Sequence, residues 1–163
     1  MIKVILRICR SLNSVAHPWA IVGGANLLLR GCASSPNDID IITTSQGVLS
    51  IAATFQSQIR HGPVWTESKA IKSNFCVANI ESIKVEVMGD PINYIGGAWI
   101  ANSEWKKHIE HIAVSESIVP VTTLNYEKRI NAILQNFNRV AAIKECITRQ
   151  TQPTQKAPAQ FAV

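Results

Sequence analysis

The chain has 163 residues, 47% of them hydrophobic, with a formal net charge of +5 and a pI near 9.2. This length and apolar content suffice for one compact domain, and no apolar run approaches the roughly 20 residues that cross a bilayer. We therefore expect a cytoplasmic protein with no membrane partner. The basic charge favours phosphorylated or polyanionic partners, but beyond that charge nothing indicates nucleic acid.

The first half of the chain alternates helical and strand patterns. Apolar residues recur at helical spacing near the N-terminus, and short apolar runs follow. In chain order we expect a helix at 2–15, a strand at 19–22, a helix at 25–32, a strand at 38–43 and a helix at 46–59.

The second half is rich in strands before it becomes helical again. We expect a hairpin of strands at 75–80 and 83–88 joined by Glu81-Ser82, a partly helical stretch at 98–111, a short strand at 112–114 and a closing helix within 123–148. The polar, proline-bearing residues after that helix lack periodicity. The expected fold is α/β (α+β), a mixed sheet flanked by helices with a C-terminal helix, in a domain at 1–147 with a disordered tail at 148–163.

The four cysteines, at positions 9, 32, 76 and 146, are far apart in the sequence. They form no Cys-x-x-Cys pattern, and their spacing is typical of neither a disulfide framework nor a zinc site. The sequence therefore predicts reduced thiols.

Two of the three aspartates lie one residue apart in the run Asn37-Asp38-Ile39-Asp40-Ile41-Ile42. Side chains alternate along a strand, so Asp38 and Asp40 project from one face while Ile39 and Ile41 serve the interior. Neighbouring carboxylates repel each other, and a divalent cation between them relieves that repulsion. We interpret the pair as a magnesium site; the alternative is an exposed strand end.

The pair Gly23-Gly24 links the strand at 19–22 to the helix at 25–32. Two glycines let the backbone approach a bound group, and the first turn of a helix presents unpaired N–H groups to an anion. A phosphate fits this arrangement, although an ordinary turn explains the glycines equally well.

A third acid, Glu86, lies in the strand at 83–88. If this strand lies beside the strand of Asp38 and Asp40, Glu86 joins the two aspartates. The alternative is a solvated strand residue paired with Lys84 or with a basic residue across the sheet.

These motifs resemble the nucleotidyltransferase superfamily that includes DNA polymerase beta. The run Trp19-Ala-Ile-Val-Gly-Gly-Ala25, followed by Asn37-Asp-Ile-Asp-Ile41 and a later strand acid, is similar to small bacterial members. These members are the aminoglycoside and lincosamide nucleotidyltransferases and the minimal nucleotidyltransferases of toxin–antitoxin pairs. The resemblance covers residues 15 to 90, and Ile118-Val-Pro-Val121 is similar to a segment that many of them carry after the third acid.

The resemblance implies a role for each matching residue. Gly23 and Gly24 line the triphosphate of ATP or another NTP, Asp38 and Asp40 bind Mg²⁺, and Glu86 completes the metal site and activates the acceptor hydroxyl. Phosphoryl transfer relies on positioning and charge neutralisation, which this set of residues can supply.

The sequence also departs from the family pattern. Ala25 stands where several relatives have a serine. Many relatives carry a basic residue and a Thr or Ser just before the paired aspartates, whereas this chain reads Cys32-Ala-Ser-Ser-Pro-Asn37. Arg30 is the nearest upstream base and the candidate for a further phosphate contact. The Arg-x-Lys-Asp type motif of many relatives is not evident, although Arg139 and Lys144 lie near its place.

Two functions from different classes follow. The first is a Mg-dependent enzyme that moves a nucleoside monophosphate to a hydroxyl of a small molecule or of a partner protein such as a toxin. The second is a weak or inactive nucleotidyltransferase-fold binding protein, such as an antitoxin or sensor. Only one or two helices follow residue 123, so a homodimer is one way to complete the acceptor site.

Overall fold

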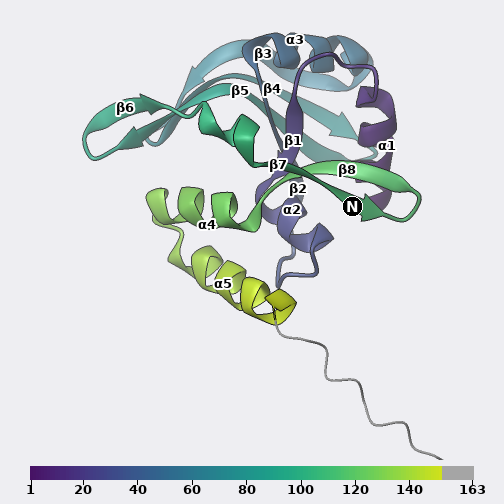
Figure 1. Cartoon of the computed structure of the whole chain (residues 1–163). Helices are drawn as coiled ribbons and strands as arrows, with labels where there is room; N and C mark the ends of the chain where they lie inside the picture. The colour runs from purple at the N-terminus through teal and green to yellow at the C-terminus, as the bar shows by residue number, and fades with distance from the viewer. Residues whose placement is uncertain (152–163) are drawn as a thin grey trace, which may run out of the picture.

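The computed structural model describes residues 1–151, which form one mixed β-sheet with helices on both faces (Figure 1). This architecture confirms the α/β (α+β) class that the sequence predicts. No helix within the described residues is long and apolar enough to cross a membrane.

The helices and strands alternate in the first third of the chain, and most strands lie in the middle. The helices are α1 (Ile2–Leu12), α2 (Gly23–Leu29), α3 (Ser45–Thr54), α4 (Leu124–Ile133) and α5 (Phe137–Thr151), with short 3-10 helices η1 (Gln56–Gln58) and η2 (Glu104–His108). The strands are β1 (Trp19–Val22), β2 (Asp38–Thr43), β3 (Ile59–Glu67), β4 (Ile71–Ile80), β5 (Ile83–Ile95), β6 (Ala98–Ala101), β7 (Ile109–Val114) and β8 (Ser117–Thr122).

The predicted strands β1 and β2 and the β4–β5 hairpin are confirmed. Glu81 and Ser82 form the hairpin turn, and both adopt the left-handed φ values, 49° and 66°, that tight turns use. The stretch at 98–111 is partly helical, as expected, through η2, but it also contains β6 and the start of β7, which the sequence did not predict. The sequence analysis also missed β3.

The single closing helix expected within 123–148 is two helices, α4 and α5. The chain breaks between them at Gln135, where φ is 58°. The second helix continues to Thr151 and so includes residues 148–151, beyond the expected domain boundary. Residues 152–163 of the expected tail lie outside the described residues.

The sheet has the strand order β3-β4-β5-β2-β1-β8-β7, and β6 pairs with the far end of β5. Strand β2 lies in the middle, antiparallel to β1 and parallel to β5. In this order, the end of β1 that leads into Gly23 lies beside Asp40 on one side of β2. Strand β5 lies on the other side of β2. The sheet topology therefore gathers the predicted site residues at its centre.

The two faces of the sheet are covered differently. Ile39 and Ile41 are fully buried against α1 and α3, which lie over one face (Figure 1). On the opposite face Ile42 packs with Trp105 of η2 and Tyr126 of α4. Alternation along β2 thus directs Asp38 and Asp40 to the second face, where the helices cover only part of the sheet.

Candidate functional site

The three predicted acids lie together on the second face of the sheet. In the parallel β2–β5 ladder Asp40 is paired with Glu86, and Asp38 is paired with Lys84. One carboxylate oxygen from each of Asp38, Asp40 and Glu86 lies within 4.8 Å of the others. The register of two adjacent strands therefore produces a three-carboxylate cluster without any long loop.

Lys84 lies between two of these acids. Its Nζ is 3.1 Å from Asp38 Oδ2 and 2.9 Å from Glu86 Oε1, and both contacts raise the pKa of the lysine. The pairing of Glu86 with Lys84, the alternative considered from the sequence, is thus present alongside the cluster. The half-exposed ammonium group shows that the two carboxylates can accept a cation between them.

The pKa of Asp40 is raised to about 7. Burial is the largest cause, the charges of Asp38 and Glu86 add to it, and Arg139 and Lys84 offset part of it. Burial and the charges of the other two acids thus oppose ionisation of Asp40, and a cation at the cluster would favour the ionised form. A few carboxylates with open coordination positions form the donor set that Mg²⁺ prefers, so these residues fit a divalent cation.

Gly23 lies directly against the acid cluster. It has a φ of +66°, and a Cβ at this position would lie 2.8 Å from Asp40 Oδ2. A Cβ on Gly24 would lie 2.9 Å from Cβ of Pro36. Close packing against Asp40 and Pro36 explains why glycine stands at both positions, whereas the approach of a bound group stays a prediction.

The N–H of Gly23 is already engaged. It donates to Glu127 Oε1 at 2.9 Å, and the same oxygen accepts from Asn26 Nδ2 at 3.0 Å and from the Thr122 hydroxyl at 2.6 Å. Glu127 is only 3% exposed. This buried carboxylate from α4 therefore anchors the first turn of α2, and nothing in the local sequence pattern predicted it.

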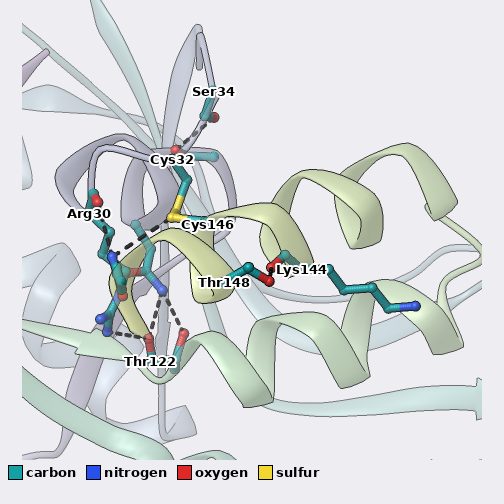
Figure 2. Close-up of a disulfide and its surroundings, with 10 residues drawn as sticks. Arg30, Cys32, Ser34, Thr122, Lys144, Cys146 and Thr148 are labelled. Carbon is teal, nitrogen blue, oxygen red and sulfur yellow. Dashed lines mark hydrogen bonds between the residues drawn. A yellow bond between two sulfur atoms is a disulfide. The ribbon is translucent and has the colours of Figure 1, made fainter. Parts of the chain in front are cut away.

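Arg30 belongs to the same buried network. Its Nε donates to Asn26 Oδ1 at 2.8 Å, and its guanidinium contacts Glu110 and donates to the Thr122 carbonyl at 2.9 Å (Figure 2). Its side chain is 9% exposed. Arg30 does not line the cavity that contains Asp40 and Gly23, so its contacts are those of a residue that joins α2 to β7 and β8.

A cavity of about 260 Å³ begins at Asp40 and Gly23 and continues between the sheet and α4; we call it the α4 cavity. Of the described residues that line this cavity, Arg139 of α5 is the only one with a cationic side chain, and its positive charge lowers the pKa of Asp40. Asn93 lines the cavity and is 3% exposed. The apolar lining residues are Val22, Ile42, Ile71, Met88, Pro91, Ile130 and Leu134.

Arg139 reaches this site because α5 is a separate helix. The Asn136 side chain accepts a hydrogen bond from the Arg139 N–H at 3.3 Å, as an N-cap residue does. Asn136 was thus the available sequence signal for a new helix start. Apolar residues at helical spacing continue across the break and concealed it.

A second cavity, of about 360 Å³, lies beside the first over β3, β4 and β5; we call it the β4 cavity. Ile71 and Met88 line both cavities. The other residues of the β4 cavity are His61, Thr66, Glu67, Ser68, Ser73, Phe75 and Glu86. The acid cluster therefore lies where two cavities meet.

Cys32 and Cys146 form a disulfide that joins the segment after α2 to α5 (Figure 2). This corrects the expectation that all four thiols are reduced. The sequence separation of 114 between the two cysteines concealed a pairing that depends on the packing of α5 against α2. Cys9 and Cys76 are free and buried, and burial raises the pKa of each thiol to about 11.

Comparison with known proteins places this arrangement in a family. Residues 4–132 match the family described as aminoglycoside-2''-adenylyltransferase. A search of curated proteins finds no significant match.

Several solved structures share the fold. TM1012 of Thermotoga maritima, assigned as a nucleotidyltransferase only by inference, is 23% identical with a TM-score of 0.78, and the match covers 91% of this chain and 92% of that one. The lincosamide antibiotic adenylyltransferase LnuA, solved with lincomycin, is 11% identical with a TM-score of 0.58 and coverages of 90% and 98%. The antibiotic-resistance factor ANT(2'')-Ia is 11% identical with a TM-score of 0.61 and coverages of 91% and 83%. At these identities the likeness concerns the fold.

Proposed function

The chain belongs to the aminoglycoside-2''-adenylyltransferase family and is a nucleotidyltransferase, and on this premise we propose that it moves a nucleoside monophosphate from ATP or another NTP to a hydroxyl group. The observation that carries the proposal is the cluster of Asp38, Asp40 and Glu86 at the junction of two cavities. We propose that these acids bind Mg²⁺. Because the donor is a cytoplasmic metabolite, we also place the reaction in the cytoplasm.

We propose that the nucleotide lies along the α4 cavity. Asp40, Gly23 and Arg139 stand at one end, where a metal-bound polyphosphate requires a carboxylate, close backbone approach and a positive charge. The apolar residues farther along suit the faces of a base. The Asn93 side chain lines the cavity and can meet the polar edge of that base.

The bound Mg²⁺ would supply charge neutralisation for the phosphate oxygens and orient the reacting groups. Glu86 accepts the proton of the acceptor hydroxyl while the oxygen of that hydroxyl forms a bond to the α-phosphorus of the nucleotide. The bond from that phosphorus to the bridging oxygen of the β-phosphate breaks, and pyrophosphate leaves with the electron pair. Arg139 stabilises the negative charge on the phosphate groups.

Membership of an enzyme family does not favour the alternative of a decayed binding protein. Lys84 nevertheless occupies the space between Asp38 and Glu86 and must give way to a metal ion. Its exposed position makes that displacement feasible, because an exposed salt bridge is worth only about 0–1 kcal/mol.

Calorimetric titration of ATP with and without Mg²⁺ tests the proposal. We expect binding that requires the metal and is lost in the double variant Asp38→Asn/Asp40→Asn. Arg60→Gln, on the exposed surface of β3, is the matched control and should bind as the wild type does. Equal binding by the wild type and the double variant would refute the magnesium site.

A further inference from the structure

The β4 cavity lies on the opposite side of the acid cluster from the proposed nucleotide site. Glu86 lines the β4 cavity but not the α4 cavity, whereas Asp40 lines only the α4 cavity. The two side chains belong to paired positions on adjacent strands. Each cavity therefore receives its own carboxylate from one cluster.

The polar lining of the β4 cavity consists mainly of groups that bind hydroxyls. Thr66, Ser68 and Ser73 place hydroxyl groups in the lining, and His61 lies in the same lining. The Thr66 hydroxyl also donates to the Ser73 carbonyl at 3.5 Å, and the Ser68 hydroxyl donates to the Ile71 carbonyl at 3.0 Å. Ser73 is only 2% exposed and lines the cavity, where its hydroxyl can donate to and accept from a hydroxyl of a bound ligand.

The charges of the cavity are already balanced. Glu67 forms a salt bridge of 2.8 Å with Lys72, and Glu86 is paired with Lys84 at 2.9 Å until the proposed Mg²⁺ takes the place of that lysine. A ligand with several ammonium groups would therefore find no uncompensated carboxylate for each of its charges. The aromatic ring of Phe75 adds a surface suited to the apolar face of a ring compound.

We propose that the β4 cavity is the acceptor site and that it binds a hydroxylated ring compound with at most one positive charge. This inference rests on the proposed function. A volume of about 360 Å³ falls in the range of about 300–1,000 Å³ for small-molecule sites. A hydroxyl bound there lies beside Glu86, which takes its proton, while the α-phosphorus approaches from the side of Asp40 and pyrophosphate leaves toward Arg139.

The first test fills the cavity without altering the acid cluster. Thr66 lies on β3, where a larger aromatic side chain suits a strand, so Thr66→Tyr should fold and occupy the cavity. Arg60→Tyr adds the same side chain to the same strand outside the cavity. Far-UV circular dichroism and thermal melts establish that both variants are folded.

The readout separates the two proposals. The titrant is α,β-methylene-ATP with Mg²⁺. It should bind the wild type and both variants with affinities that lie within threefold of one another. Pyrophosphate release with an acceptor should fall at least 30-fold in Thr66→Tyr and less than threefold in Arg60→Tyr. Absence of nucleotide binding by the wild type would refute the proposed function, whereas normal binding with full turnover by Thr66→Tyr would refute only the acceptor site.

The second test addresses the chemical class of the acceptor. Mass spectrometry follows nucleotide addition to lincomycin, which has one basic amine, to neutral methyl glycosides and to the polyamine tobramycin. We expect modification of at least one singly charged or neutral probe, and a value of kcat/KM at least 10-fold lower for tobramycin. Preference for tobramycin, or nucleotide binding with no modification of the other probes, would overturn the assigned class.

Discussion

The acid cluster and Arg139 reach the same cavity from parts of the molecule that are held by different interactions. The backbone pairing of β2 with β5 holds Asp38, Asp40 and Glu86 in place, independently of what their side chains contact. Side-chain contacts position the α4–α5 pair instead, through Glu127 and through the disulfide from Cys146. The comparison teaches that the acids can be replaced without loss of the fold, whereas the helical side depends on a few buried groups.

Removal of Glu127 should have the largest effect on stability. The change Glu127→Ala leaves the Gly23 N–H without its acceptor and takes one partner from each of Asn26 and Thr122. We expect the free energy of unfolding to fall by about 3–5 kcal/mol, because buried donors lose a charged acceptor. Urea denaturation measures this value.

The matched variant for this prediction is Glu127→Gln, which retains an acceptor oxygen and the shape of the side chain. It should lose less than half as much stability as Glu127→Ala. A loss below about 1 kcal/mol in Glu127→Ala would show that the buried network is not what anchors α4 to α2.

The same contrast explains which parts of the site could be predicted from the sequence. Asp38 and Asp40 share a face because strands alternate, and only one further step, the pairing of β2 with β5, was needed to add Glu86. The position of Arg139 in the site depends on the break between α4 and α5 at Gln135, and no glycine or proline marks that break. Arg30 looked like a phosphate ligand because of its place in the chain, but its contacts with Asn26, Glu110 and Thr122 arise from folding.

Reduction of the disulfide is a second way to weaken the attachment of the α4–α5 pair. Reduction releases the link between Cys32 and Cys146, which closes a long loop between the segment after α2 and α5. We expect a reductant to lower the free energy of unfolding by about 2–4 kcal/mol, the usual effect of such a link. Chemical denaturation with and without dithiothreitol measures the difference.

The double variant Cys32→Ala/Cys146→Ala controls for other effects of the reductant, because its stability should not respond to dithiothreitol. Thiol titration of the oxidised, denatured protein should detect Cys9 and Cys76 alone. Four reactive thiols in that sample would show that the link does not form.

In the acid cluster on the sheet, removal of the Asp40 charge should raise the free energy of unfolding instead of lowering it. The pKa of Asp40 is raised from 3.8 to about 7, chiefly by burial and then by Asp38 and Glu86. Between about pH 4 and pH 7 the folded protein therefore keeps a proton that the unfolded chain has released, and stability falls as the pH rises. Above about pH 7 the ionised group imposes its full penalty on the fold.

Asp40→Asn removes this penalty, so in EDTA at pH 8 it should raise the free energy of unfolding by about 1–3 kcal/mol, discounted for solvent screening. The gain should shrink as the pH is lowered and vanish below about pH 3, where Asp40 is protonated in both states. Asp38→Asn is the comparison variant, because it removes only the Coulombic part of the penalty on Asp40 and breaks the contact of the half-buried Asp38 with Lys84, so its gain should be smaller than that of Asp40→Asn. Urea denaturation across this pH range measures both variants. Stabilisation of Asp40→Asn that does not change with pH would show that packing, rather than relief of the buried charge, is responsible, because only the charge titrates.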